Sequence, residues 1–117
     1  MPHVVLNGNI EIESIFDKLN PLFIRNNGNI LKTQEIYLER KKTMILVDSL
    51  VIDSEQKISF FTIIANRGNS IVVRLSPNSQ IKKTNGVKKL LAEIAKQLIK
   101  DFPQLTVSET NLEEYLW

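Results

Sequence analysis

The middle of the chain alternates between apolar stretches and short polar connections. Four apolar-rich stretches between Ile30 and Leu75 are separated only by residues 39–42, 53–57 and 66–69. Connections this short join antiparallel neighbours, because a parallel return needs a dozen residues or more. Beta-branched and aromatic residues dominate the stretches, which favours strands over buried helices for runs of this length. The pattern therefore predicts a four-stranded antiparallel meander.

The second and third strands of this meander are apolar on both faces. They run from Thr43 to Asp53 and from Lys57 to Asn66, and a strand of this kind needs a cover on each side of the sheet. If the helices cover one side only, a set of large side chains on the other side stays in water, at a cost of about 1.5 to 3 kcal/mol each. We assign to this set, or to its counterparts on the alternate face, Ile45, Val47, Val51, Phe61 and Ile63.

Helical spacing of apolar residues predicts one helix before the meander and one after it. The first helix follows a short strand at residues 3–6, is interrupted at Asn20-Pro21 and ends near Gly28, with Leu22 to Ile24 still buried. The second helix begins at Thr84 or Asn85, which offer a cap, and stops before Pro103.

The C-terminal tail is predicted to be a short strand at Leu105 to Val107, followed by a capping box formed by Thr110 and Glu113. The whole chain, residues 1–117, then forms a single two-layer α+β domain. Its antiparallel sheet has four to five strands, and two helices lie on one face. This order of strand, helix, four strands and helix is similar to that of one repeat of the TATA-binding-protein fold, a resemblance of topology alone.

Composition narrows the class of protein but not its chemistry. The 117 residues are 43% hydrophobic and 24% charged, and the formal net charge is +2, which indicates a globular protein. The absence of cysteine excludes disulfides and thiolate metal sites and favours a reducing compartment, so we expect a cytoplasmic protein. No apolar run approaches the ~20 residues that cross a bilayer. We expect no membrane association, no cofactor and no metal.

An interaction surface explains the largest part of the sequence. We expect a non-catalytic binding or assembly domain that uses the second face of the sheet, with Tyr115 and Trp117 as aromatic anchors. The expected partner is a second copy, giving a homodimer, or another protein. Asp48, in the middle of a strand, is expected to bond a neighbour such as Thr62.

A cluster of lysines around the second helix supports an alternative, nucleic-acid binding through a basic helix face. The candidate residues are Lys82, Lys83, Lys88, Lys89, Lys96 and Lys100. Lysines on an exposed helix face also serve simply to keep that face soluble, and no phosphate-binding glycine loop accompanies them.

Signals for an enzyme are sparse, because His3 is the only histidine and no nucleophile motif is present. The start Met1-Pro2-His3 followed by an apolar strand resembles that of the tautomerase superfamily. The resemblance implies that Pro2 becomes the general base once the initiator Met is removed. It also implies carboxylate-binding arginines, for which this chain offers Arg25, Arg40, Arg67 and Arg74, none of them matched to a family position. The four-strand meander departs from the paired strand-helix-strand units of that family.

Overall fold

The computed structural model describes residues 1–53, 56–77 and 79–117. Over these residues the chain forms seven strands: β1 (His3–Asn7), β2 (Phe23–Asn26), β3 (Asn29–Leu38), β4 (Met44–Asp53), β5 (Gln56–Arg67), β6 (Ser70–Leu75) and β7 (Thr106–Thr110). It also forms three helices: α1 (Ile12–Lys18), α2 (Asn85–Asp101) and α3 (Glu113–Leu116). Ser54, Glu55 and Asn78, which the sequence places in connections, lie outside the described residues.

The described strands form one curled antiparallel sheet in the order β2-β3-β4-β5-β6-β1-β7. Strands β2 to β6 make a continuous meander, and β1 pairs with β6 on one side and β7 on the other. The predicted α+β class with an antiparallel sheet is confirmed. The predicted numbers were too small, because the described residues contain seven strands and three helices in place of four to five and two.

The largest correction concerns the segment after the first helix. We expected a kinked helix with Phe23 buried, but α1 ends at Lys18 and residues 23–26 form β2, in which Phe23 is exposed. β2 pairs with β3 through a two-residue turn whose central residues, Asn27 and Gly28, both have positive φ. Positive φ at both positions defines the type I′ hairpin turn, for which Asn-Gly is the preferred sequence. The Asn-Gly pair thus closes a hairpin and does not end a helix.

The register between β4 and β5 decides which side chains share a face. Ile45 pairs with Ile64, and Asp48 pairs with Phe61, so odd-numbered residues of β4 lie beside even-numbered residues of β5. One face, called the covered face, carries Val4, Leu6, Leu31, Ile45, Val47, Val51, Phe60, Ile64, Ile71, Val73 and Leu75, which belong to one hydrophobic cluster. The opposite face, called the open face, carries Val5, Leu46, Leu50, Phe61, Ile63 and Val72.

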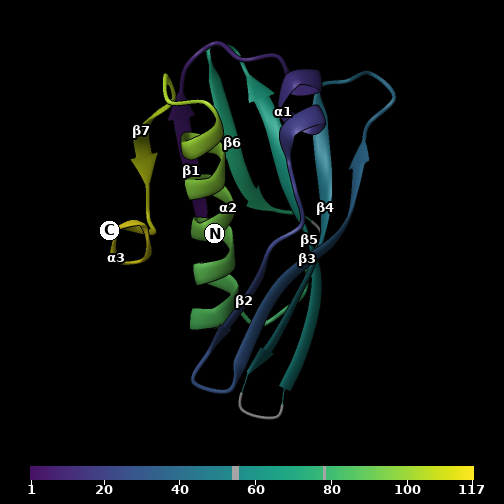
Figure 1. Cartoon of the computed structure of the whole chain (residues 1–117), viewed down its shortest axis with the longest axis vertical. Helices are drawn as coiled ribbons and strands as arrows, with labels where there is room; N and C mark the ends of the chain where they lie inside the picture. Colours follow the sequence, from purple (N-terminus) through teal and green to yellow (C-terminus); the bar gives the residue numbers. More distant parts are fainter. Residues whose placement is uncertain (54–55, 78) are drawn as a thin grey trace.

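All three helices contribute to the cluster on the covered face. Their buried residues include Ile12 and Ile15 from α1, Leu90, Leu91, Ile94 and Leu98 from α2, and Leu116 from α3. Figure 1 shows α1 and α2 on the same side of the sheet. The predicted cap is confirmed, since the Thr84 side chain accepts a hydrogen bond from the backbone N–H of Val87. None of the helices in the described part of the chain has the length and apolar content that crossing a bilayer requires.

Glycine at the start of α2 allows the helix to approach the sheet closely. A Cβ atom at Gly86 would lie 2.7 Å from Cγ1 of Val51, closer than two carbon atoms can approach. The buried hydroxyls beneath the helix are all paired. Ser49 Oγ lies 2.9 Å from Thr62 Oγ1 and donates to the Val47 carbonyl, while Thr33 Oγ1 accepts from a backbone N–H. Thr62 therefore bonds Ser49 and not Asp48, whose side chain belongs to the open face.

Candidate functional site: the open face of the sheet

The aliphatic side chains of the open face are sheltered by their own neighbours. Ile63 is flanked across the strands by Leu46 and Arg74, and Leu50 by Lys32 and Ser59. Ile63 and Leu50 are buried, yet neither belongs to the cluster beneath the helices. Long side chains cover apolar neighbours with their methylene stems while their charged ends stay in water. The open face thus has a layer of aliphatic residues that is sheltered by neighbouring side chains of the sheet and by none of the described helices.

Three aromatic side chains stand exposed above this layer, and we call them the aromatic patch: Phe23, Tyr37 and Phe61. Their exposed fractions are 61%, 50% and 41%. Phe23 pairs with Lys32 and Tyr37 with Leu46, which places both on the same face as Phe61. The rings of Tyr37 and Phe61 meet edge to face with centroids 6.5 Å apart. Phe23 lies on the edge strand β2, in the row of Lys32 and Leu50, so the patch extends across β2 to β5 with only Tyr37 and Phe61 in ring contact.

Charges of both signs border the aromatic patch. Asp48 pairs with Phe61 in the β4–β5 register, and Lys32 and Arg74 stand on strands to either side. Asp48 and Lys32 make no ion pair among the described residues.

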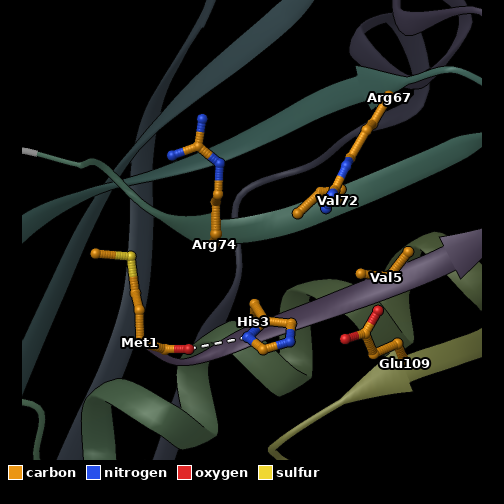
Figure 2. Close-up of a pocket in the computed structure, with 7 residues that line it drawn as sticks. All are labelled: Met1, His3, Val5, Arg67, Val72, Arg74 and Glu109. Atoms are coloured by element: carbon orange, nitrogen blue, oxygen red, sulfur yellow. Dashed lines mark hydrogen bonds between the residues drawn. The ribbon is translucent and has the colours of Figure 1, made fainter.

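A second feature, the basic pocket, lies at the β6–β1–β7 end of the open face. Its floor is Val72 and its cross-strand partner Val5, and Glu109 of β7 ends the same row. Arg74 and His3 pair in the next row, and Arg67 reaches the pocket from the end of β5 (Figure 2). The pocket has a volume of about 210 Å³. A second hollow of about 300 Å³ adjoins it and shares Arg67, Val72 and Arg74.

The edge of the basic pocket is fixed by hydrogen bonds at the start of the chain. His3 Nδ1 lies 2.9 Å from the carbonyl oxygen of Met1, as Figure 2 shows. Because a carbonyl can only accept, Nδ1 carries the proton and Nε2 is left as the acceptor of the neutral ring. Asn111 also donates to the Met1 carbonyl and accepts from the His3 backbone N–H. No protein-family model, no curated protein and no solved structure matches this chain.

The residues assigned from the sequence to the second face do not share one surface. Ile45, Val47 and Val51 lie on the covered face and are buried beneath the helices. Phe61 and Ile63 lie on the open face, as expected for residues that no helix covers. The register between β4 and β5 explains the division, because it places odd-numbered residues of β4 beside even-numbered residues of β5. A register shifted by one residue would move every side chain of one strand to the other face.

The two aromatic residues at the C-terminus are on the helix side of the sheet. Tyr115 packs against the core cluster, and its hydroxyl donates to Asn85 Oδ1 at 2.8 Å. Burial raises the pKa of Tyr115, and the neighbouring Glu114 carboxylate adds to the effect. Trp117 is 79% exposed. The predicted capping box at Thr110 does not form, because Leu112 is the N-cap of α3 and Thr110 Oγ1 donates to the His3 carbonyl.

The lysines proposed for nucleic-acid binding are on or just before α2, also on the helix side. Lys89, Lys96 and Lys100 follow helical spacing along one stripe, whereas Lys88 falls outside it. Glu93 shares the stripe and pairs with Lys96 at 3.2 Å. Lys82 and Lys83 are exposed in the segment that leads into the helix. An acidic side chain within the stripe weakens the attraction to a phosphate backbone.

Residues named for enzymatic chemistry are only partly brought together. Pro2 is buried, and in this chain its nitrogen is part of the peptide bond to Met1. Arg67 and Arg74 line the pocket beside Met1, while Arg25 lies on β2 and Arg40 follows β3. Among the described residues no group of three or more His, Cys, Asp or Glu side chains lies close enough to hold a metal ion.

Sequence reasoning missed two parts of the open face. Phe23 was assigned to a buried helix, although the Asn27-Gly28 pair that follows it signals a hairpin. The β5–β6 hairpin places Arg67 near Arg74, but the basic pocket was missed because only the pairing of β1 with β6 brings His3 and Val5 to them. This pairing links residues about seventy positions apart in the sequence, and no local pattern reports it.

Proposed function

We propose that this chain is a non-catalytic binding and assembly domain that forms a homodimer through the aromatic patch on the open face. The observation that carries the proposal is the placement of the exposed aromatic side chains. Among the described residues five large apolar side chains are exposed: Met1, Phe23, Tyr37, Phe61 and Trp117. Three of them form the patch, on the face that no helix covers. Aromatic residues supply much of the binding energy at protein interfaces.

A second copy is the partner that fits the charges of this face. A two-fold interface uses the same surface on both subunits, so that surface must be complementary to itself. The open face carries Asp48 near its centre and Lys32 and Arg74 on either side. A two-fold axis that passes between Asp48 and Lys32 would place the carboxylate of one subunit opposite the cation of the other. The resemblance of topology to the TATA-binding-protein repeat has no part in this proposal.

The experiment compares two exposed aromatic residues on opposite sides of the molecule. We expect the wild-type chain to be a dimer by light scattering after size exclusion at micromolar concentration. Phe61→Lys should be monomeric, since it places a charge in an apolar contact, and dimer formation should weaken at least about a hundredfold, as for an interface hot spot. Trp117→Lys is the matched control and should remain dimeric.

Two results contradict the proposal. The first is a wild-type chain that remains a monomer across the micromolar range. The second is a dimer that Trp117→Lys breaks and Phe61→Lys leaves intact, which would move the interface to the helix side. Circular dichroism of both variants checks the fold, which we expect to persist because both side chains are already exposed.

A further inference from the structure

We propose that the basic pocket at the β6–β1–β7 end of the open face binds a small organic oxyanion, a carboxylate or phosphate group attached to a compact apolar body. This site adjoins the aromatic patch, because Arg74 borders the patch and also lines the pocket, but none of the three aromatic residues belongs to the pocket. The patch spans β2 to β5, whereas the pocket is formed by β1, β6, β7 and the end of β5 (Figure 2). The inference therefore does not depend on the homodimer.

The first argument is that two arginines line the same pocket, each without a carboxylate partner among the described residues. Within the described chain neither Arg67 nor Arg74 makes an ion pair. Arg74 donates one long hydrogen bond of 3.3 Å to the Leu75 carbonyl, and most of its donors remain available. Each guanidinium presents a planar set of donors that matches the two oxygens of a carboxylate or phosphate.

The second argument is that one edge of the pocket, formed by Met1 and His3, is already held by hydrogen bonds before any ligand arrives. The Met1 carbonyl accepts from His3 Nδ1 and from Asn111 Nδ2, both at 2.9 Å. These bonds orient the imidazole ring beside Arg74, its partner in the β1–β6 register. A preorganised site avoids part of the entropy cost of binding.

The third argument concerns the body of the ligand. Val5 and Val72 form an apolar floor between the rows that carry the basic residues. A volume of about 210 Å³, with the adjoining hollow of about 300 Å³, suits a single ring or a short branched chain, since drug-sized ligands occupy about 300 to 1,000 Å³. Glu109 at the outer end of the floor repels a second anionic group. The ligand therefore carries one oxyanion, held by the arginines.

The test is a nuclear magnetic resonance titration of the full chain, observing the methyl groups of Val5 and Val72. The probes are benzoate, phenyl phosphate, inorganic phosphate and the neutral benzyl alcohol, each at up to millimolar concentration. We expect saturable shifts with benzoate or phenyl phosphate, and the stronger of the two identifies the head group. Inorganic phosphate, which lacks the apolar body, and benzyl alcohol, which lacks the charge, should bind at least about tenfold more weakly.

Three variants assign the binding to the pocket. Arg67→Gln and Arg74→Gln should each weaken binding about tenfold, the effect of losing a charge-assisted hydrogen bond. Arg40→Gln removes an exposed arginine outside the pocket and should leave the affinity unchanged. The monomeric Phe61→Lys variant should bind as the wild type does, which keeps a failure of the dimer distinct from a failure of this site.

The proposal is overturned if neither benzoate nor phenyl phosphate shifts the Val5 and Val72 methyl groups. It is equally overturned if the affinity is the same in the Arg67→Gln and Arg74→Gln variants as in wild type. Benzyl alcohol binding as tightly as benzoate would also overturn it, because the pocket would then recognise the apolar body alone.

Discussion

The two faces of the sheet bury aliphatic side chains to a similar degree by different means. Ile64 on the covered face has no exposed surface, and its neighbour Ile63 on the open face is 5% exposed. Ile64 packs in the cluster beneath the helices, whereas Ile63 is sheltered by Leu46 and Arg74 on the adjacent strands. Burial alone therefore does not distinguish a core from a surface covered by flexible side chains.

The polar side chains of the two faces also differ, in whether they have partners within the chain. On the covered face the hydroxyls of Thr33, Ser49 and Thr62 are buried and hydrogen-bonded. On the open face Asp48 and Lys32 stand without an ion-pair partner among the described residues. A finished core satisfies its polar groups internally. The polar groups of the open face are not satisfied within the described chain in the same way.

The strongest test of this difference compares the two adjacent isoleucines. Ile64→Ala should lower the free energy of unfolding by about 2 to 5 kcal/mol, because packed helices cannot collapse fully into the cavity. Ile63→Ala should cost roughly 1 to 2 kcal/mol, because the side chains above it can move into the space. Urea unfolding of both variants in the monomeric Phe61→Lys background measures the difference without a contribution from association.

Equal costs for the two alanine variants would mean that the open face is as rigidly packed as the core. The case for an external partner would then lose its basis, since that face would gain little from further cover. The control measures the unfolding free energies of Ile63→Ala and Ile64→Ala in the chain without the Phe61→Lys change. There the cost of Ile63→Ala should become larger as protein concentration rises, because the substitution weakens the dimer contact while dimer formation stabilises the folded wild type by mass action.

The sequence predicted the elements whose signals are local. Thr84 caps α2 as expected, and the helix ends before Pro103, because caps and prolines act on the nearest turn. The meander followed from the short connections between apolar runs. Residues 23–26 were misassigned because apolar side chains in a four-residue strand fit helical and extended spacing equally well.

The sequence did not show which side chains of the different strands share a face of the sheet. Both faces of β4 and β5 are apolar, so alternation does not show which side the helices cover. The pairing of Val47 with Thr62 separates Ile45, Val47 and Val51 from Phe61 and Ile63. A different pairing by one residue would have joined them. The basic pocket depends on the long-range pairing of His3 with Arg74, which tertiary packing alone determines.

A second test uses the asymmetry of the buried hydroxyl pair on the covered face. Ser49 Oγ donates to the Val47 carbonyl, so Thr62 Oγ1 is the donor in the 2.9 Å contact with Ser49. Ser49→Ala leaves the Thr62 donor buried without this acceptor and should cost about 1 to 3 kcal/mol. Thr62→Val removes the donor itself and should cost less than about 1 kcal/mol. Urea unfolding measures both, and the reverse order would contradict this hydrogen-bond arrangement.

The smallest expected effect on stability concerns Tyr115, which lies on the helix side of the sheet and whose hydroxyl donates a hydrogen bond to the Asn85 side chain. Burial raises the pKa of Tyr115 above its usual value of 10.0, so the folded state favours the neutral phenol. The resulting stabilisation is complete below pH 10 and is lost as pH rises through the higher pKa of the folded state. The difference in unfolding free energy between wild type and Tyr115→Phe should therefore fall above about pH 10.

Tyr37 on the open face supplies the matched control for this titration. Its hydroxyl makes no hydrogen bond to the described residues, and its half-exposed ring contacts Phe61. Tyr37→Phe should therefore change the unfolding free energy by less than about 0.5 kcal/mol at neutral pH. If the change in unfolding free energy caused by Tyr37→Phe instead equalled that caused by Tyr115→Phe at alkaline pH, the two faces would stabilise their tyrosine hydroxyls to the same extent. The distinction between a covered side with internal partners and an open side without them would then fail for hydroxyl groups.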